Sequence, residues 1–267
     1  MTERKTITLE QFRQEMTLRG GDRRGISYLT SEKKRNWERC LGAVAAALTA
    51  PAVGLLATAV IAKDGRPWMY DLGRDNLPEE LVEALAQQGL AVSIPKIRTL
   101  ERDAQKKEKR ILQKMTLGQN EGHDPRRIPG MEWVRKSRLD EIPQFWAVAK
   151  GKLGVVGHRE LTRGEDEKER KRNPVRPEYE VYRLLTKLSG VLPGMTGAYF
   201  LLGDKQTPMN VRFEGEIIYF LNATPAGDLW IVWETIRQMW SLEKAVAREG
   251  VERVRARYLQ RTKKTED

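Results

Sequence analysis

The chain has 267 residues, 40% of them hydrophobic, which allows one large or two small domains with a true hydrophobic core. Lys and Arg number 48 against 37 Asp and Glu, and the formal net charge of +11 favours anionic partners such as nucleic acid, phosphorylated small molecules or an acidic membrane surface. One cysteine excludes a disulfide framework and a cysteine-based zinc site, and two histidines argue against a histidine-rich metal site. A hard cation held by carboxylates stays compatible with this composition.

The first predicted element is an uncharged apolar run, "CLGAVAAALTAPAVGLLATAVIA", which extends over 23 residues from Cys40 to Ala62. Its length is sufficient to cross a bilayer. Mostly polar residues precede it, so it does not resemble a cleaved signal peptide. Three interpretations are open: a buried helix of a soluble core, a full membrane span, or a re-entrant segment that enters and leaves the membrane on one face.

The residues in and around this run favour the re-entrant segment. Pro51 lies at its centre and lacks a backbone N–H, so it is expected to kink or break a helix. Basic residues flank both ends: Lys33, Lys34, Arg35 and Arg39 before the run, and Lys63 and Arg66 after it. Because positive charge tends to stay cytoplasmic, a hairpin bent at Pro51 keeps both flanks on the same side, whereas a full span separates them. The backbone at the break then needs protein or water around it.

Four elements are predicted in the next part of the chain. A helix covers residues 75–89, with a start signal at its N-terminal proline and an end at Gly89. Residues 90–100 alternate in the manner of a strand. Residues 101–115 and residues 139–153 are each typical of a helix, the first of them highly charged.

The C-terminal part is predicted to be more polar at its surface. Residues 162–178 form a charged run that is expected to be a solvated helix end and loop. Residues 215–240 contain an apolar stretch, a predicted turn near Pro225, Ala226 and Gly227, and then a helix. The residues from Ser241 onward are typical of a basic helix with a charged end.

Several short motifs occur in a fixed order between residues 32 and 238. Lys34, Arg35 and Glu38 precede the apolar run with its central proline, and the segment "KIRTL" follows later. Then come "VRKSRLDEIPQFWAVAKGKLGVVGHRE", "LPGMTG", "EIIYFLN" and "GDLWIV". In this order they resemble the bacterial sugar transferases, the monotopic polyprenyl-phosphate glycosyl-1-phosphate transferases.

The resemblance implies a fold and a domain organisation. The expected fold class is α/β, mostly helical with a small sheet, as a compact cytosolic catalytic domain behind an N-terminal re-entrant membrane helix hairpin. Residues 1–31 are then a polar extension, residues 32–66 the hairpin, residues 67–240 the catalytic domain and residues 241–267 a basic C-terminal helix or tail.

The resemblance also implies a reaction. A sugar 1-phosphate passes from a nucleoside-diphosphate sugar to membrane polyprenyl phosphate, in the family undecaprenyl phosphate, and so initiates glycan or exopolysaccharide synthesis. Mg²⁺ is the implied cofactor, and the implied location is the cytoplasmic face of the bacterial inner membrane, embedded in one leaflet. Two phosphorylated substrates need cationic side chains, and a carboxylate can attack phosphorus to form an acyl phosphate.

Seven residues of this chain are implied in the site. The family's nucleophile is the aspartate of an Asp-Glu pair just after the strand motif, and the candidate here is Asp103, which is also the implied metal ligand. The implied phosphate or substrate ligands are Lys96, Arg98, Arg135 and Arg159. Asp140 and Glu141 are implied as a supporting pair, and they also suit a helix N-terminus, where negative charge is stabilised.

This sequence departs from the family pattern at several of these positions. No adjacent Asp-Glu pair follows the strand motif; Glu101 lies two positions before Asp103, where a helix would point it away. Arg159 is kept, but the family's flanking prolines are replaced by His158 and Glu160, so the rigidity of that turn is expected to be lost. The family's Asp is Glu at position 216, and its Gln aligns with Phe200.

Three hypotheses follow for the function. The first is an active, divergent phosphoglycosyl transferase. The second is a family member that has lost catalysis and acts as a membrane-bound interaction or regulatory subunit. The third, a nucleic-acid binder, is disfavoured because the basic runs lack interleaved aromatic residues and any recognisable binding motif.

Overall fold

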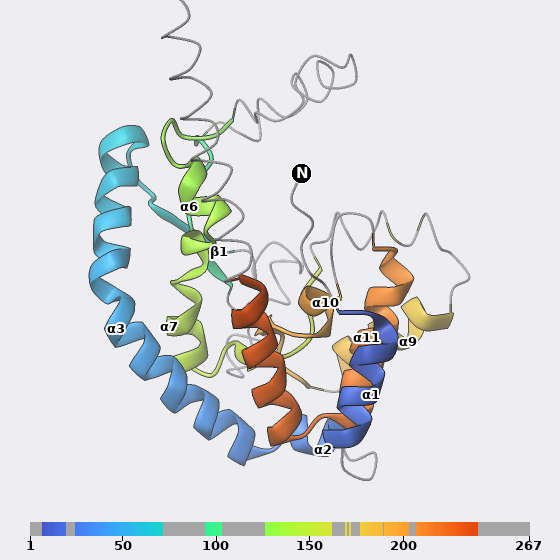
Figure 1. Ribbon diagram of the computed structural model, residues 1–267. Helices are drawn as coiled ribbons and strands as arrows, with labels where there is room; N and C mark the ends of the chain where they lie inside the picture. The colour runs from blue at the N-terminus through green and yellow to red at the C-terminus, as the bar shows by residue number, and fades with distance from the viewer. Residues whose placement is uncertain are drawn as a thin grey trace, which may run out of the picture. The chain divides into compact units, whose positions relative to one another are not determined.

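The structure is a computed structural model that describes residues 7–19, 25–71, 94–102, 126–161, 177–188, 190–202 and 207–239, together with 169 and 171. Its helices are α1 (Leu9–Arg19), α2 (Gly25–Leu29), α3 (Glu32–Asp64), α6 (Glu132–Lys136), α7 (Gln144–Ala149), α9 (Pro177–Leu188), α10 (Ala198–Leu201) and α11 (Met209–Asn222), with the 3-10 helix η2 (Leu139–Glu141). A further helix covers residues 225–239. Its strands are β1 (Met69–Asp71), β2 (Pro95–Ile97), β3 (Gly154–Val156) and β4 (Gly194–Thr196). The predicted mostly helical fold with a small sheet is therefore confirmed in the described residues (Figure 1).

The chain divides into two compact units, and each combines separated segments of sequence. Unit 1 consists of Met1–Ser31, Val156–Arg159 and Val175–Asp267. Unit 2 consists of Glu32–Val155 and Glu160–Pro174. The domain boundaries predicted from the sequence follow the chain order, and they stay predictions.

Helix α3 carries the apolar run and organises unit 2. One stripe of its residues is buried at helical spacing: Lys34, Glu38, Gly42, Ala46, Val53, Leu56 and Val60. Near its start α3 lies close against α7, where a Cβ on Gly42 would come within 2.7 Å of the Ala149 nitrogen. Glycine at this position therefore permits the close approach of the two helices.

The predicted break of this helix at Pro51 is absent from the structure. Helix α3 continues through Pro51 as one curved helix of 33 residues (Figure 1). Proline removes one backbone donor within a helix and tends to bend it, and neighbouring turns can keep their own hydrogen bonds. The re-entrant hairpin is thus not confirmed. A continuous helix over the 23 apolar residues would be about 35 Å long, enough for the roughly 30 Å hydrocarbon core.

The face of α3 opposite the buried stripe is apolar and exposed. Leu48 and Leu55 are 77% and 74% exposed, and Leu41 and Val44 lie uncovered on the same helix. By length and composition α3 is compatible with a membrane segment. An exposed apolar face on a long helix is the arrangement expected for contact with lipid, because in water it would leave a large apolar area solvated.

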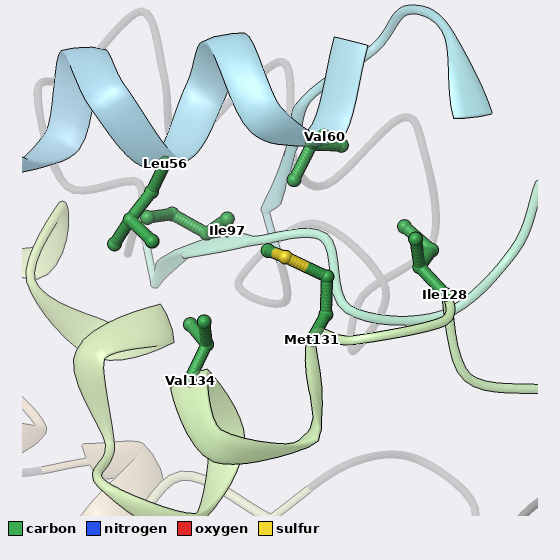
Figure 2. Packing of buried hydrophobic residues seen from close by; sticks show 6 residues of the cluster. All are labelled: Leu56, Val60, Ile97, Ile128, Met131 and Val134. Carbon is green, nitrogen blue, oxygen red and sulfur yellow. The ribbon is translucent and has the colours of Figure 1, made fainter. Parts of the chain in front are cut away.

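The C-terminal half of α3 contributes to the core of unit 2. The core residues are Leu56, Val60, Ile97, Ile128, Met131 and Val134 (Figure 2). Strand β2 supplies Ile97 and pairs antiparallel with β1, Met69 opposite Ile97. The strand predicted over residues 90–100 is therefore confirmed only over residues 95–97. Residues 90–93 lie outside the described part of the chain, as do the predicted helix 75–89 and nearly all of the helix predicted over 101–115.

The helix predicted over residues 139–153 is shorter and divided in two. The 3-10 turn η2 comes first and α7 follows it, with Pro143 at the N-cap position between them. Helix α7 ends before Gly151, which has a φ of 69° in the left-handed region that suits glycine. The residues at the N-cap positions of η2 and α7 are Arg138 and Pro143, and neither makes a side-chain capping hydrogen bond.

Unit 1 is built around α11. Helices α1, α2 and α9 all pack against it, and its Phe213 ring lies 4.7 Å from the ring of Tyr182, between centroids. Phe12 and Met16 of α1 are fully buried, so residues 9–19 belong to this core although the sequence there is mostly polar. Thr8 and Gln11 form a reciprocal capping box at the start of α1.

The turn predicted at Pro225, Ala226 and Gly227 lies two residues earlier. The chain leaves helical structure at residues 223–224, and residues 225–227 form the first turn of the next helix. The Thr224 hydroxyl accepts a hydrogen bond from the Gly227 N–H at 3.1 Å. Pro225 follows this cap at the first helical position, where its missing N–H costs nothing.

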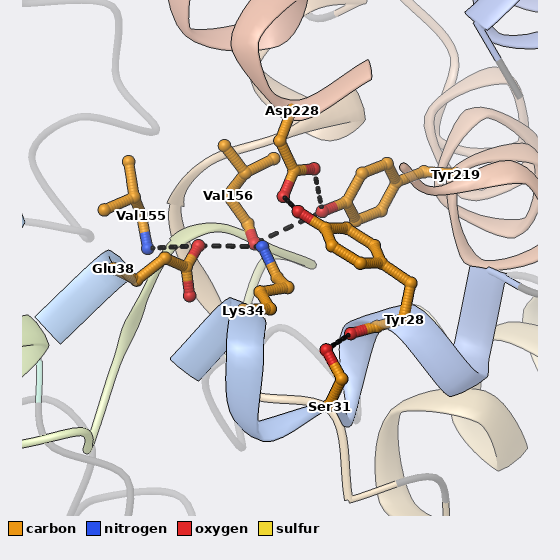
Figure 3. A network of polar contacts seen from close by, with 8 residues as sticks. All are labelled: Tyr28, Ser31, Lys34, Glu38, Val155, Val156, Tyr219 and Asp228. Carbon is orange, nitrogen blue, oxygen red and sulfur yellow. Dashed lines mark hydrogen bonds and ion pairs between the residues drawn. The ribbon is translucent and has the colours of Figure 1, made fainter. Parts of the chain in front are cut away.

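The buried ion pair at the start of α3 generates a prediction about stability. Lys34 and Glu38 lie 2.7 Å apart with both side chains 4% exposed, and Glu38 also accepts the Val155 N–H at 3.1 Å (Figure 3). Glu38→Gln should lower the free energy of unfolding by about 3–5 kcal/mol, because it leaves the Lys34 ammonium group buried without its countercharge. Urea unfolding in detergent measures this difference.

A double variant and a control separate charge from packing. Adding Lys34→Met to Glu38→Gln should recover most of the lost stability, since it removes the buried positive charge. The control Glu15→Gln breaks a pair with Arg19 at the same spacing whose side chains are 34–35% exposed, and it should cost less than about 1 kcal/mol. Equal losses from Glu38→Gln and Glu15→Gln would contradict the account.

Candidate functional site

Two motifs that are far apart in the sequence meet in unit 1. The Gly157 N–H donates to the Thr196 carbonyl, and the Gly194 N–H donates to the His158 carbonyl, each at 3.0 Å. A Cβ on Gly157 would lie 2.5 Å from the Leu192 carbonyl oxygen. The glycines of "GHRE" and "LPGMTG" therefore allow the two backbones to approach closely enough to hold the residues that follow them.

The turn that carries Arg159 is held without the family's flanking prolines. His158 is buried, and its ring stacks on Phe220 with 5.8 Å between centroids. The Tyr182 hydroxyl donates to the Arg159 carbonyl. The Arg159 side chain is exposed, with its guanidinium carbon 4.9 Å from the centroid of the Tyr199 ring. Side-chain contacts and backbone pairing thus constrain this turn where the sequence predicted a loss of rigidity.

A buried carboxyl group lies beside this turn. Glu216 of α11 is fully buried, and its Oε1 accepts the Tyr199 N–H at 2.8 Å. Its Oε2 accepts no hydrogen bond in the described part of the chain. Burial raises the pKa of Glu216 to about 8, while the N–H groups of Tyr199 and Arg159 and the Arg159 guanidinium act in the opposite direction. Near neutral pH the group is mostly protonated.

A tyrosine–aspartate hydrogen-bond network lies next to the strand that leads to Arg159. The hydroxyl groups of Tyr219 and Tyr28 donate to the two oxygens of Asp228, at 2.7 and 2.9 Å (Figure 3). The Tyr219 hydroxyl also lies 3.3 Å from the Val156 carbonyl, at the end of β3. The Tyr of "EIIYFLN" and the Asp of "GDLWIV" are therefore hydrogen-bonded to each other. Tyr219 also contacts the end of the strand that precedes Arg159.

Unit 2 brings four of the predicted site residues together. Lys96 lies 2.8 Å from Glu141, and Arg138 lies 3.6 Å from the other oxygen of Glu141. Burial raises the pKa of Asp140 to about 6, with Glu141 acting in the same direction and with Lys96 and Arg135 acting against it. Asp140, Glu141, Lys96 and Arg135 thus form one electrostatic cluster at the η2 turn.

Arg98 has a different environment from the other predicted phosphate ligands. Its guanidinium donates to the carbonyls of Asp64, Gly65, Pro67 and Leu100 and to the Asp64 carboxylate. These five bonds use all five N–H groups of the side chain. Phosphate binding by Arg98 stays a prediction, and the geometry favours a structural role in which it ties the end of α3 to β2.

The candidate nucleophile Asp103 lies outside the described residues. Its neighbour Arg102 is described, and the Arg102 N–H donates to the Asp64 carboxylate at 3.1 Å. In the described ranges no group of three or more His, Cys, Asp or Glu side chains is placed to hold a metal ion. These residues therefore do not by themselves supply a Mg²⁺ site, and the implied metal stays a prediction attached to Asp103.

The sequence did not single out two residues of the Arg159 site. Tyr199 follows the "LPGMTG" turn, and the guanidinium groups of Arg159 and Arg212 both contact its ring. The guanidinium carbon of Arg212 lies 4.8 Å from the ring centroid. Arg212 lies one helical turn before Glu216 on α11, so the two residues share a face. That spacing was the one available signal, and it has little specificity on its own.

Comparison with known proteins gives one family over most of the chain. The family model described as bacterial sugar transferase matches residues 29–242. An undecaprenyl-phosphate galactose phosphotransferase of Salmonella typhimurium (strain LT2) is 31% identical over 126 residues, 47% of this chain and 22% of that protein. A UDP-galactose-lipid carrier transferase of Erwinia amylovora is 32% identical over 114 residues, 43% of this chain and 21% of that protein.

A third relative matches over a longer range at lower identity. The galactosyl transferase CpsE of Streptococcus agalactiae serotype III is 25% identical over 207 residues, 73% of this chain and 38% of that protein. The matched region thus spans between about a fifth and two fifths of the length of these curated relatives.

The raised pKa of Glu216 predicts a pH dependence of stability. The ordinary pKa is 4.5, so between about pH 4.5 and pH 8 the folded chain keeps a proton that the unfolded chain has released. The free energy of unfolding therefore falls as pH rises through this window, by up to about 1.4 kcal/mol per unit. Glu216→Gln removes this contribution, so the variant should gain stability relative to the wild type between pH 5.5 and pH 8.5 in urea unfolding.

Comparison with the wild type at each pH isolates this group, because Asp140 contributes equally to both proteins. Glu214→Gln is the matched control, since Glu214 is a partly exposed carboxylate of the same helix, α11, and pairs with Arg13 of α1. A stability difference between wild type and Glu216→Gln that stays constant over the whole pH range would show that Glu216 does not titrate as proposed.

Proposed function

Since the chain belongs to the bacterial sugar transferase family, we propose that it transfers a sugar 1-phosphate from a nucleoside-diphosphate sugar to membrane polyprenyl phosphate. The products are a polyprenyl-diphosphate sugar and a nucleoside monophosphate, and the reaction would initiate the synthesis of a glycan such as an exopolysaccharide. The proposed location is the cytoplasmic face of the bacterial inner membrane.

The Arg159 site is the observation that carries this proposal. Four family motifs meet there through hydrogen bonds: the "GHRE" turn, the "LPGMTG" turn, and the Glu216–Tyr219 and Asp228 segments of α11 and the next helix. Arg159, whose side chain is exposed, lies on a turn that these hydrogen bonds hold in place. Such an arrangement suits a phosphate group, which accepts paired hydrogen bonds from arginine.

The names of the relatives support the proposed kinds of substrate. Two of them are named for transfer involving undecaprenyl phosphate or a lipid carrier, and all three names refer to galactose or its transfer. We extend the lipid carrier to this chain as the acceptor. The exposed apolar face of α3 suits a protein whose acceptor lies in a membrane, and the net charge of +11 suits anionic substrates at a lipid surface.

The proposed transfer proceeds in two displacements. A carboxylate oxygen of Asp103 attacks the β-phosphorus of the donor, and the bond from that phosphorus to the bridging oxygen breaks, so that the nucleoside monophosphate leaves with the bonding electrons. A phosphate oxygen of the polyprenyl phosphate then attacks the same phosphorus and releases the Asp103 carboxylate. Arg159 binds phosphoryl oxygens and offsets their charge throughout. Mg²⁺ stays the proposed cofactor: bound at Asp103, it would offset negative charge on the donor diphosphate.

A membrane-bound interaction or regulatory subunit is the second candidate function. Two observations favour it: the adjacent Asp-Glu pair is absent after "KIRTL", and the guanidinium of Arg98 is fully engaged within the protein. Such a subunit would keep the fold, the membrane helix and partner surfaces without turnover.

A turnover assay tests the enzyme against the subunit. Purified full-length chain in detergent is incubated with labelled nucleotide sugars, Mg²⁺ and polyprenyl phosphate, and the products are separated. We expect release of nucleoside monophosphate with the sugar recovered in the lipid fraction. Release of nucleoside diphosphate would contradict phosphoglycosyl transfer, and no turnover across a broad panel of donors would favour the subunit.

The same assay tests the proposed nucleophile. Asp103→Asn should lower turnover by roughly 10³-fold or more, because an amide oxygen does not form the acyl phosphate. Glu108→Gln is the matched control in the same stretch of sequence and should leave turnover close to wild type. Wild-type turnover by Asp103→Asn would refute the assignment of the nucleophile and leave the transfer reaction standing.

A labelling experiment tests the proposed re-entrant topology. In a Cys40→Ser background, single cysteines replace Lys33 and Arg66, two exposed residues on opposite flanks of the apolar run. The hairpin predicts that a membrane-impermeant maleimide labels both from the cytoplasmic side in inverted vesicles. Labelling of the two positions from opposite sides would instead establish a full span, which the uninterrupted helix α3 also allows.

A further inference from the structure

Glu216 is a fully buried carboxyl group that takes no part in the proposed transfer steps, yet it lies beside the turns that build the Arg159 site. Its helix, α11, approaches α10 closely because residue 215 is glycine, where a Cβ would collide with the Leu202 side chain. A Cβ on Gly197, in the "LPGMTG" turn, would lie 3.7 Å from the Glu216 Oε1. The close approach of α11 therefore brings this carboxyl group to the backbone of the turn.

Glu216 supplies the cap that helix α10 does not make for itself. The N-cap residue of α10 is Gly197, which has no side chain with which to bind the first N–H groups of the helix. The Glu216 Oε1 accepts the Tyr199 N–H at 2.8 Å instead. The carboxyl group thus fixes the backbone of Tyr199, whose ring contacts the Arg159 guanidinium, with 4.9 Å between the guanidinium carbon and the ring centroid.

The same carboxyl group interacts with Arg159 itself. The Arg159 N–H and the Arg159 guanidinium both favour the ionised form of Glu216, whereas burial favours the protonated form and raises the pKa of Glu216 to about 8. Because the interaction between two charges is mutual, an ionised Glu216 attracts the Arg159 guanidinium and repels an anion bound to it. A protonated Glu216 keeps the hydrogen bond from Tyr199 and adds no negative charge beside the guanidinium.

Other titratable and charged groups face α11 from the elements around it. They are His158 of the Arg159 turn, the phenol of Tyr199, Arg212 of α11 itself, Tyr182 and Arg183 of α9, Arg13 of α1, Tyr28 of α2, and the pair of Tyr219 and Asp228. A change of pH acts on these groups in the wild type and in a Glu216 variant alike. Comparison of the two proteins at the same pH therefore isolates Glu216.

We propose that Glu216 is a positioning residue for Arg159: its protonated form holds the Arg159 and Tyr199 turns in place, and its ionisation weakens the binding of a phosphate group by Arg159. This inference rests on the proposed transfer function and deepens it. Two substrates carry the phosphate group, the nucleotide sugar and the polyprenyl phosphate. The site would bind such a group more tightly at neutral than at alkaline pH.

Titration calorimetry on the full chain in detergent tests the inference, with UDP and a short polyprenyl phosphate in micelles as probes. From pH 6.5 to pH 9 the affinity of the wild type, divided by that of Glu216→Gln at the same pH, should fall about 10-fold, within the usual range for coupling between two sites. Glutamine keeps an acceptor for the Tyr199 N–H and does not ionise, and the ratio cancels the titration of the probe. A purely structural role would change the affinity by the same factor at every pH.

Two further measurements test the route through Arg159. At pH 8 the wild type should take up a fraction of a proton more than Glu216→Gln on binding a phosphorylated probe, measured in two buffers of different ionisation enthalpy. In Arg159→Gln, the fall in stability that Glu216 produces with rising pH should extend to higher pH, because the guanidinium that favours the ionised form is gone. Urea unfolding, with Arg159→Gln/Glu216→Gln as the reference, measures this shift.

Glu214→Gln is the matched control, because it removes a partly exposed carboxylate from the same helix. It should follow the wild type at every pH with both probes. Urea unfolding of each variant checks that the fold is kept.

The outcomes separate this inference from the proposed function. A fall confined to UDP assigns Arg159 to the donor diphosphate, and a fall confined to polyprenyl phosphate assigns it to the acceptor. If the wild type binds a phosphorylated probe and the affinity ratio stays constant from pH 6.5 to pH 9, the inference is overturned while the transfer function stands. If the wild type binds neither phosphorylated probe, the proposed function fails, and the inference fails with it.

Discussion

The buried ion pair between Lys34 and Glu38 is the constraint on which the arrangement of unit 2 depends. It places two opposite charges on one stripe of α3, just ahead of the apolar run, and Glu38 uses the same oxygen to accept the N–H of Val155. The start of α3 is thereby hydrogen-bonded to Val155 of β3. A surface pair at the same spacing would be screened by solvent, whereas this pair is desolvated and tolerates the loss of neither partner.

The Arg159 site begins at Val156, the last residue of β3. Val156 is held by Tyr219, Gly157 and His158 pair with the "LPGMTG" turn, and Arg159 then projects to the surface over Tyr199. Each of these contacts restricts the conformations of the segment from Val156 to Arg159, so the Arg159 guanidinium is positioned before any substrate binds. Preorganisation of this kind is what phosphoryl transfer needs, because the protein contributes mainly orientation and charge.

Much of this architecture could be predicted from the sequence, where strong local signals exist. The apolar helix, the strand at Ile97 and the helix after Pro143 could be predicted from hydrophobic runs and from the positions of Gly and Pro. The ordered motifs identified the family. Helix α1 gave no such signal, because its two buried residues, Phe12 and Met16, are surrounded by polar ones and become core only against α11. The roles of Arg98 and Arg212 depend on partners far away in sequence, which no local pattern encodes. At Pro225 the sequence signal was read as a turn, although the preceding threonine makes it a helix start.

In the proposed mechanism, this chain carries a sugar phosphate on one of its own carboxylates during transfer. Intact-protein mass spectrometry after mixing with donor, in the absence of polyprenyl phosphate and after rapid acid quench, measures this directly. The account predicts a mass increase equal to one sugar phosphate, abolished in Asp103→Asn and removed by hydroxylamine, which cleaves acyl phosphates. Release of nucleoside monophosphate only when acceptor is present, with no added mass on the protein at any time, would contradict it.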